Sequence, residues 1–599
     1  MRSLIKKLVY LLPKKDPFKL ALLFVLMLIA AGIEVVGIGM IPAFVSIVAA
    51  PDRVLEFEPL TGLWQILNIT NDQDLLLFGS VALVGIFIIK SMYMLAYNYT
   101  EAKYIYNRRY FMSHRLMSSY MQAPYTFHLG RNSSELLRNT NSEVNIIVNN
   151  VLTNLLKLSK EGLMTLSILL FLLIMEPLIS LVVIFLSGFG AGSFLMFTQK
   201  KVKRYGKQEQ GHRRNMIQAV QQGLGGIKDA RVLNRENHFI EKYRVEAYES
   251  TKLKTYIRYI QQIPKPVVET TAVLGMMLIS AIMVWQGRPM GTIIPILTLF
   301  AMATVRLMPS VQQLSTLYTS LRYNLVAVDP IYDDLKELEE YRKNFLADRK
   351  KQDSIRLEHA IEAENISYSY PGADEKALDN ISFTAPKGRA IAFVGESGAG
   401  KTTIVDLILG LLTPTSGTIR VDGQDIQEGV SAWQRNIGYI PQSIYLADES
   451  LRNNVAFGIP ESEIDDEKVY QAIESAQLSE MVSRLPYGLN TMIGENGTRI
   501  SGGQRQRVGI ARALYHNPQV LVMDEATSAL DNITEKEITS AIESLKGDKT
   551  VIMIAHRLTT VENCDVLYLM NNGKIVDQGS YDYLVDTNRE FRKMALVSE

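Results

Sequence analysis

The chain has 599 residues, a length that predicts more than one domain. Its 63 Lys and Arg residues nearly balance its 62 Asp and Glu residues, and the formal net charge of +1 argues against a general nucleic-acid binder. The mean hydropathy of +0.05 is high for a soluble protein, and the long apolar runs lie in the first half of the chain.

Six stretches of the first half are long and apolar enough to cross a bilayer, which takes about 20 helical residues. The first follows a basic N-terminus and is too long for a cleavable signal peptide. One such stretch could be a buried helix of a soluble protein, but six in half a chain favour membrane spans. We therefore expect a transmembrane domain over residues 1–340. Its six spans are expected near residues 18–48, 74–98, 148–175, 178–198, 266–286 and 291–320.

Basic residues predict which ends of the spans are cytoplasmic, because Lys and Arg concentrate in cytoplasmic loops. The N-terminus and the stretches after the second and fourth spans are basic, and the last of these contains "QKKVKRYGKQEQGHRR". The loop over residues 51–73 has only Arg53 among its basic residues, so we expect it to face outward. Its "LTGLWQIL" predicts either a short helix at the membrane surface or a packed loop.

The two cytoplasmic connections are long, polar and poor in Gly and Pro clusters. We expect the spans to continue into the cytoplasm as helices, joined by short elbows. The elbows are predicted at "APYTFHLGRNSSE" (123–135) and "GLGGIKDARVLN" (223–234). Elbows far below the membrane are well placed to contact a soluble domain.

Three cations lie within or beside predicted spans. Arg306 interrupts the apolar run "FAMATVRLMPS", Lys90 interrupts "GIFIIKSMYM", and Lys265 stands at the inner end of the fifth span. A charge that faces lipid at depth costs about 2.5–3.5 kcal/mol, so we expect these side chains to face a water-filled cavity or a partner. For Arg306 an ion pair with Glu34 of the first span is the alternative, and for Lys265 snorkelling to the surface.

The composition changes near residue 340, where "KELEEYRKNFLADRKKQDS" predicts a charged helical linker that occupies 341–360. Strand and helix patterns then alternate, which predicts an α/β domain over 361–599. Its "IAFVGESGAGKTTIVDLILGLL" is a strand, a glycine-rich turn and a helix, the context of a P-loop. Backbone N–H groups and the helix N-terminus bind phosphates, the lysine reaches the β- and γ-phosphates, and the first threonine ligates Mg²⁺. The expected nucleotide-binding residues here are Gly395, Glu396, Ser397, Gly398, Ala399, Gly400, Lys401, Thr402 and Thr403.

Two further motifs follow in this domain. "QVLVMDEATSALD" predicts a buried strand that ends in Asp524, suited to the Mg²⁺ shell, and Glu525, which can polarise a water for attack on the γ-phosphate. In "ISGGQRQRVGIARAL", Ser501 and two glycines precede a helix and form a second anion-binding N-terminus. One domain has no obvious use for two such phosphate sites, whereas two chains placed head to tail do.

Together these motifs resemble those of half-size ATP-binding-cassette exporters, over nearly the whole chain. The "ISGGQ" stretch resembles the signature sequence of that family, with Ile500 where Leu is more usual. Tyr370 in "SYSYPG" resembles the aromatic residue that stacks on adenine. Gln442 in "GYIPQS" resembles the Q-loop glutamine, which links the γ-phosphate and Mg²⁺ to the membrane domain. Asp531, which ends "SALD", and His556 in "IAHRLTT" resemble the D-loop and switch residues.

The resemblance implies a domain-swapped homodimer with two equivalent ATP sites, in which an exporter-type α-helical membrane domain is fused to a P-loop α/β nucleotide-binding domain. The elbows would dock on the cassettes, the second one on the partner chain. The catalytic residues would be Glu525, His556 and Gln442. The Mg²⁺ ligands would be Thr402, Gln442 and Asp524. The signature residues that close on the nucleotide of the other chain would be Ser501, Gly502, Gly503 and Gln504.

The membrane half resembles bacterial flippases for polyprenyl-diphosphate-linked oligosaccharides of the glycosylation pathway, through "RLMPS" and the acidic outward loop. This resemblance implies transport of a lipid-linked oligosaccharide across the bacterial cytoplasmic (inner) membrane, with Lys90, Lys265 and Arg306 around the diphosphate. An exporter of drugs, lipid A or other amphipathic lipids is the alternative. The complete catalytic set argues against a membrane protein that transports nothing.

Overall fold

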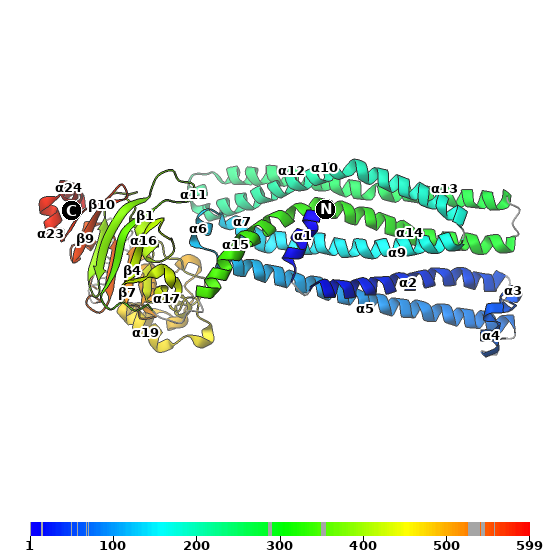
Figure 1. Ribbon diagram of the computed structural model, residues 1–599, viewed down its shortest axis with the longest axis horizontal. Helices are drawn as coiled ribbons and strands as arrows, with labels where there is room; N and C mark the ends of the chain where they lie inside the picture. The colour runs from blue at the N-terminus through cyan, green and yellow to red at the C-terminus, as the bar shows by residue number, and fades with distance from the viewer. Residues whose placement is uncertain are drawn as a thin grey trace. The chain divides into compact units, whose positions relative to one another are not determined.

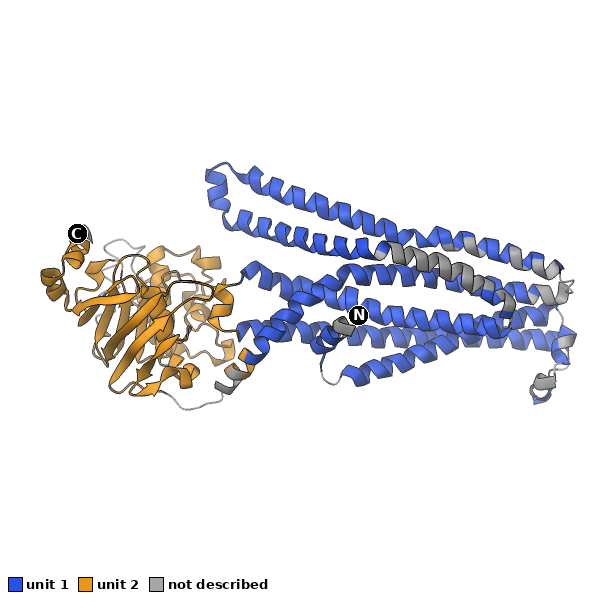
Figure 2. Ribbon diagram, turned by 45° about the horizontal axis from the view of Figure 1, so that its top comes forward, with its two compact units in different colours: residues 1–122, 131–340 blue, residues 123–130, 341–599 orange. Residues whose placement is uncertain are grey.

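A computed structural model describes residues 2–13, 16–49, 51–56, 58–66, 69, 71–175, 177–285, 290–348, 355–524, 540, 545–555 and 557–598. The chain forms two compact units (Figure 2). Unit 1 comprises Met1–Gln122 and Arg131–Glu340, and unit 2 comprises Ala123–Gly130 and Tyr341–Glu599. The first predicted elbow therefore belongs largely to the unit that contains the nucleotide-binding motifs.

Long helices form unit 1, and they occupy the stretches in which spans were predicted (Figure 1). They are α2 (Asp16–Ala49), α5 (Asp72–Met121), α9 (Thr153–Met175), α10 (Pro177–Gly225), α13 (Pro264–Trp285) and α14 (Met290–Asn324). Within the described part of the chain, three helical stretches are both long and apolar enough to cross a membrane: Asp16–Ala49, Asp72–Met121 and Ser133–Met175.

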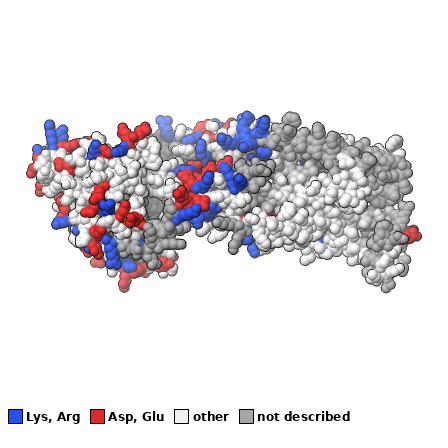
Figure 3. Space-filling model, in the orientation of Figure 1, with Lys and Arg blue, Asp and Glu red and all other residues white. Residues whose placement is uncertain are grey.

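The helices of unit 1 continue well beyond the length of a membrane span. Helix α5 has 50 residues, so it is about 75 Å long at 1.5 Å per residue, against a hydrocarbon core of about 30 Å. On the face shown in Figure 3, Lys, Arg, Asp and Glu gather over unit 2 and over one end of unit 1. That end carries α7, α12 and α15 in Figure 1, and it is the end expected in the cytoplasm.

Shorter elements connect the long helices. The elbows contain α6 (Tyr125–Leu129) and α11 (Ile227–Val232), and α12 (Glu236–Gln262) packs along α10. The remaining elements of unit 1 are α1 (Arg2–Leu11), α3 (Pro51–Leu55), α4 (Glu58–Ile66), α7 (Ser133–Arg138), the π-helical turns η1 (Asn139–Glu143) and η2 (Ile147–Leu152) on either side of α8 (Val144–Ile146), the 3-10 turn η3 (Leu325–Ala327), and α15 (Val328–Asp348), which continues into unit 2.

The loop expected to face outward, for which the sequence left a surface helix or a packed loop open, is helical and packed around Trp64. Trp64 of α4 is buried, and its indole Nε1 donates to the carbonyl oxygen of Val54 at 3.1 Å. Its ring meets that of Phe78 on α5 edge to face, with centroids 5.8 Å apart. Trp64 therefore fixes α4 against the start of α5.

Unit 2 contains two sheets. The larger has six strands in the order β10-β9-β3-β8-β7-β6, in which β9, β3, β8, β7 and β6 run parallel and β10 pairs antiparallel with β9. Its strands are β3 (Ala390–Val394), β6 (Ile437–Ile440), β7 (Val520–Asp524), β8 (Thr550–Ile554), β9 (Val566–Asn571) and β10 (Lys574–Gly579). Strands β3, β7 and β8 are buried along their whole length, as expected for a parallel sheet covered on both faces.

The smaller sheet is antiparallel, in the order β2-β1-β4-β5. Its strands are β1 (Ala360–Tyr368), β2 (Leu378–Pro386), β4 (Ser416–Val421) and β5 (Gln424–Asp425). The helices and 3-10 turns of unit 2 include α16 (Lys401–Ile408), η4 (Ile426–Glu428), α17 (Val430–Gln434), α18 (Leu451–Val455), η5 (Glu461–Glu463), α19 (Asp466–Ser475), α20 (Ser479–Arg484), η6 (Gly488–Asn490), η7 (Glu495–Gly497), α21 (Gly502–Leu514), η8 (Leu558–Thr560), α23 (Tyr581–Thr587) and α24 (Arg589–Ser598). One apolar core packs between the two sheets around α16, and another packs between the six-stranded sheet and α21.

The contact of α10 with α14 depends on Gly206, because a Cβ there would lie 2.2 Å from the carbonyl oxygen of Tyr323. We predict that Gly206→Ala lowers the free energy of unfolding by about 1–3 kcal/mol, the usual cost of overpacking. Gly211→Ala on the same helix is the matched control, since no heavy atom outside the local helix backbone lies within 4 Å of the position that its methyl group would occupy. Thermal unfolding of the purified protein measures both variants, and equal melting temperatures would contradict the prediction.

Candidate functional site

The glycine-rich turn connects β3 to α16 in a backbone conformation that excludes side chains at two positions. Gly395 has φ +152°, and a Cβ there would lie 2.2 Å from the carbonyl oxygen of Met570. Gly400 has φ +97°, and a Cβ there would lie 2.7 Å from Leu378 Cδ2. The turn therefore needs glycine for close backbone approach as well as for backbone freedom.

The turn wraps around the ammonium group of Lys401. Its Nζ donates to the carbonyl oxygens of Gly395 and Glu396 at 2.7 and 2.8 Å, and the residue is only 4% exposed. Lys401 also begins α16, so the positive charge and the N-terminus of that helix lie together. This combination favours a bound phosphate group.

Tyr370 lies beside the same helix. Its hydroxyl is 3.1 Å from Oγ1 of Thr403, and its ring meets that of Tyr368 edge to face at 5.1 Å. A hydrogen bond to α16, the helix that follows the P-loop, thus positions Tyr370, the residue expected to stack on adenine.

Two carboxylates lie close together at the base of the site. Asp524 ends β7 and is 6% exposed, and Asp406 on α16 is 8% exposed. Burial, and then the negative charge of Asp524, raises the pKa of Asp406 to about 6. The site therefore carries concentrated negative charge at the position where a divalent cation is expected.

The donor chemistry fits Mg²⁺. The side chains of Thr402 and Asp524 offer hard oxygen ligands, and phosphates and waters supply the others in sites of this kind. Among the described residues no group of three or more His, Cys, Asp or Glu side chains could hold a metal, and such a Mg²⁺ site does not need one. Bound Mg²⁺ would neutralise charge on the β- and γ-phosphates.

The sheet order places further predicted residues at the same edge. Strands β6 and β7 run parallel, with Ile440 opposite Met523, so exposed Gln442 and buried Asp524 follow neighbouring strand ends. Glu525, Asp531 and His556 lie outside the described residues. Strand β7 ends immediately before Glu525, and β8 ends two residues before His556. The two strands pair in parallel, so their carboxyl ends lie at the same edge of the sheet.

The predicted signature forms the exposed N-terminus of α21. Ser501 is the N-cap: its Oγ accepts from the backbone N–H of Gln504 at 3.2 Å, and its own N–H donates to Gln504 Oε1 at 2.9 Å. This reciprocal capping box orders the first turn, which contains Gly502 and Gly503. The exposed helix terminus is suited to an anion from outside the unit.

The first elbow lies largely in unit 2, where burial and the negative charge of Asp406 raise the pKa of Tyr125 on α6. The second elbow, in unit 1, exposes apolar side chains instead. Val232 is 73% exposed and Leu233 is 65% exposed.

Within the helices of unit 1, Arg306 makes the ion pair that was the alternative reading of this residue. Its Nε lies 2.6 Å from Oε1 of Glu34, and its Nη2 lies 3.6 Å from the sulfur of Met164. The Nζ of Lys90 lies 3.2 Å from the same Glu34 oxygen. Glu34 is 3% exposed, so one buried carboxylate holds two cations from α5 and α14. We call these three residues the Glu34 triad.

Lys265 lies apart from the Glu34 triad. Its side chain is 57% exposed and its Nζ is 4.0 Å from Glu269, one turn along α13. The structure thus brings two of the three predicted cations together and leaves the third on an exposed helix face.

A polar cavity of about 550 Å³ contains cations that the sequence reading passed over. Lys157 and Lys160 line it from α9, and buried Glu101 and Glu161 lie in the same wall. Glu161 accepts from the Ser310 hydroxyl at 2.9 Å. These lysines lie inside the predicted span 148–175 and are not among the predicted substrate residues, and only the three-dimensional packing shows that they share a cavity.

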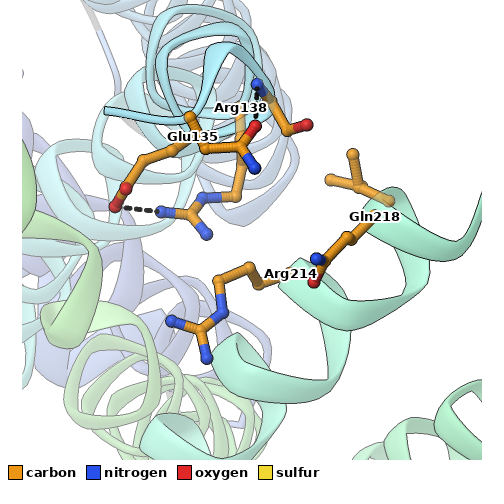
Figure 4. Close-up of a pocket in the computed structure, with 7 residues that line it drawn as sticks. Glu135, Arg138, Arg214 and Gln218 are labelled. Atoms are coloured by element: carbon orange, nitrogen blue, oxygen red, sulfur yellow. Dashed lines mark hydrogen bonds and ion pairs between the residues drawn. The ribbon is translucent and has the colours of Figure 1, made fainter. Parts of the chain in front are cut away.

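A smaller cavity of about 220 Å³ lies between α7 and α10. Figure 4 shows the guanidinium groups of Arg138 and Arg214 extending toward the same side of it. Arg138 pairs with Glu135 at 3.3 Å and with Glu143 at 3.7 Å, so its charge is compensated. None of the predicted site residues lines this cavity.

Known protein families match both halves of the chain. The family model described as the transmembrane region of ABC transporters matches residues 59–307, and the model described as ABC transporter matches residues 378–528. A solved structure described as a bacterial Atm1-family ABC exporter with ATP bound aligns over 96% of this chain and 98% of its own, with a TM-score of 0.75 and 20% identity. The likeness confirms the predicted fold class.

Two bacterial relatives match nearly the whole chain, and each is named an ATP-dependent lipid A-core flippase. The protein from Cupriavidus metallidurans is 28% identical over 582 residues, which cover 97% of this chain and 93% of the relative. The protein from Ralstonia nicotianae is 30% identical over 573 residues, which cover 94% and 92%.

We predict that Glu525→Gln keeps ATP binding and nearly abolishes turnover, because an amide cannot accept a proton or orient a water as a carboxylate does. Lys401→Ala is the matched variant for binding, since it removes the ammonium group inside the P-loop and should weaken ATP affinity. Equilibrium nucleotide binding and phosphate release from the purified protein separate the two effects. Near-normal ATPase activity in Glu525→Gln would contradict the role of Glu525.

Proposed function

The chain belongs to the ABC transporter family as a half-size exporter whose ATPase is coupled to translocation, and we propose that it carries an anionic amphipathic glycolipid of the lipid A-core type outward across a bacterial cytoplasmic membrane. Two relatives that cover nearly the whole chain bear the name lipid A-core flippase. This name supports the alternative stated from the sequence better than a lipid-linked oligosaccharide. Both substrates would share a negatively charged phosphate head and a lipid tail.

The Glu34 triad carries the proposal for an anionic head group. It joins one carboxylate to two cations, so one positive charge is in excess among apolar helices. The side chains of Lys90 and Arg306 remain 20% and 28% exposed, so each can contact a second anion while it stays paired with Glu34. A phosphate is a natural bidentate partner for the arginine.

The 550 Å³ cavity adds to this argument. Its lysines are balanced by two carboxylates, which suits a head group that carries both charges and hydroxyl groups. The Nζ of Lys160 lies 5.0 Å from the ring centroid of Tyr97, a cation–π contact that positions the ammonium group. We infer that lipid head groups pass through this cavity while the acyl chains stay in the bilayer.

The working unit is proposed to be a homodimer with its N-termini and cassettes in the cytoplasm. The exposed signature helix of each chain would close on the nucleotide bound at the P-loop of the other, and Thr402 and Asp524 would hold Mg²⁺ there. The exposed apolar residues of the second elbow, Val232 and Leu233 among them, support docking of that elbow on the partner cassette.

We predict that Arg306→Ala raises the glycolipid concentration for half-maximal ATPase stimulation by about tenfold, the effect of losing one charge-assisted contact. The measurement uses lipid A-core, its dephosphorylated form and a polyprenyl-diphosphate oligosaccharide in nanodiscs. Lys265→Ala is the control, because that exposed lysine pairs only with its helix neighbour in the described structure. Dephosphorylated lipid should stimulate both variants and the unmodified protein equally weakly.

Two results would contradict this role of Arg306. One is an unchanged half-maximal concentration in Arg306→Glu. The other is loss of folding in Arg306→Ala that Glu34→Ala restores, which would assign Arg306 to the ion pair alone.

For the composite ATP site, we predict that Ser501→Arg blocks hydrolysis but leaves ATP bound at the P-loop. In dimers mixed with Lys401→Ala chains, one site carries both defects and the other carries neither, so part of the ATPase activity should return. Phosphate release from the separate and mixed variants measures this. Full activity of Ser501→Arg alone would overturn the head-to-tail arrangement.

A further inference from the structure

The chain crosses between the two units at three places: after Gln122, after Gly130 and after Glu340. Any movement of the cassette unit must reach the membrane helices through these segments or through contacts between the units. The segments on the unit 1 side of all three crossings meet at one buried carboxylate.

This carboxylate belongs to Asp334 on α15. Its Oδ2 accepts from the Tyr120 hydroxyl at 2.5 Å and from Nδ2 of Asn139 at 3.0 Å. Its Oδ1 accepts from Nη1 of Arg131 at 3.1 Å, and Nη2 of Arg131 continues to Glu337 at 3.0 Å. Tyr120 stands just before the first crossing and Arg131 just after the second, while Asp334 precedes the third. We call Tyr120, Arg131, Asn139 and Asp334 the Asp334 cluster.

The cluster is enclosed by the protein. Asp334, Tyr120 and Asn139 are 2%, 4% and 0% exposed. Burial and the hydrogen bond to Asp334 raise the pKa of Tyr120, so its hydroxyl stays protonated and donates. A buried carboxylate requires its donors, because an unpaired one costs several kcal/mol. The crossing segments are therefore held in one arrangement.

Helix α1 holds α15 from another side. The Nζ of Lys7 lies 2.7 Å from Asp329, and the Tyr10 hydroxyl donates to Glu339 at 2.7 Å. Arg115 of α5 donates to the carbonyl oxygen of Tyr10 at 2.8 Å. Because α1 bridges α15 and α5, the segments before the first and third crossings are tied together twice.

We propose that the Asp334 cluster is the joint that makes the crossing segments of α5, α7 and α15 move as one body, so that ATP-driven movement of the cassette reaches the membrane helices. In this role Asp334 and Tyr120 are positioning residues, since both are buried and act through the segments that they hold together. The proposal rests on the proposed function in that the cassette drives translocation. The cluster couples ATP hydrolysis to lipid translocation, so its loss should leave hydrolysis running with less translocation.

The test is the amount of lipid A-core translocated per ATP hydrolysed in proteoliposomes. Tyr120→Phe removes one hydroxyl and leaves Asp334 with two donors, so the fold should persist. We expect the ratio to fall about threefold or more, as for other residues that transmit coupling. Asp334→Asn removes the charge and replaces one acceptor oxygen with an N–H donor, which then faces either Arg131 or the donors Tyr120 and Asn139. The ratio should therefore fall at least as far as in Tyr120→Phe.

Tyr104→Phe is the matched control. Tyr104 lies on the same helix, is also buried, and donates to Asp16 at 3.2 Å, while Arg108 pairs with Asp16 at 3.1 Å. It reproduces the chemistry of the cluster away from any crossing. The ratio should stay unchanged in Tyr104→Phe, and an equal fall in both variants would overturn the proposal.

A second readout keeps this test independent of the lipid. Spin labels at exposed position 251 of α12 report the distance between the two protomers, since the native Cys564 is buried. With ATP and vanadate, the distance should change less in Tyr120→Phe than in the unmodified protein at equal nucleotide occupancy. A full change in Tyr120→Phe refutes the joint, whereas absence of lipid transport by the unmodified protein refutes only the proposed substrate.

Discussion

A charge among apolar helices must be paired, and this constraint organises unit 1. Glu34 brings α2, α5 and α14 to one point because Lys90 and Arg306 share its carboxylate. The same rule acts outside the predicted spans, at Asp16 with Arg108 and at Asp334 with its three donors. Each buried carboxylate fixes the rotation of the helices around it, because the side chains meet in only one orientation.

The two ends of the protein use charge in different ways. In the cassette, Lys401 and the N-terminus of α16 attract the phosphates of ATP, while Asp406 and Asp524 concentrate negative charge beside them. Within the Glu34 triad, one positive charge remains beyond what Glu34 compensates. Transport of an anionic lipid then requires that nucleotide-driven movement change the surroundings of that charge. The proposed role of the Asp334 cluster is to transmit this movement from the cassette to the membrane helices.

Motifs read along the chain predicted the P-loop, the strand ending at Asp524 and the helix beginning after Ser501, because each depends on neighbouring residues only. Pairings between helices were harder to predict. Glu34 was one candidate partner for Arg306. The side chains of adjacent helical residues point about 100° apart, so the direction in which Lys90 points depends on how its helix is rotated against its neighbours. Sequence alone does not give that rotation, and it could not show that Lys90 also pairs with Glu34. Asp334 escaped notice because it lies in an acidic, helical stretch that reads as solvated. Lys157 and Lys160 lie inside the predicted third span, but sequence alone could not show that they share a cavity with Glu101 and Glu161.

The most direct test of the account follows the lipid itself. Proteoliposomes with outward-facing cassettes receive ATP, and an impermeant reagent measures how much lipid A-core head group moves from the outer to the inner leaflet. We predict ATP-dependent movement of lipid A-core that exceeds movement of the dephosphorylated lipid and of a neutral glycolipid. Equal movement of the charged and neutral lipids, or movement that continues without ATP, would contradict it.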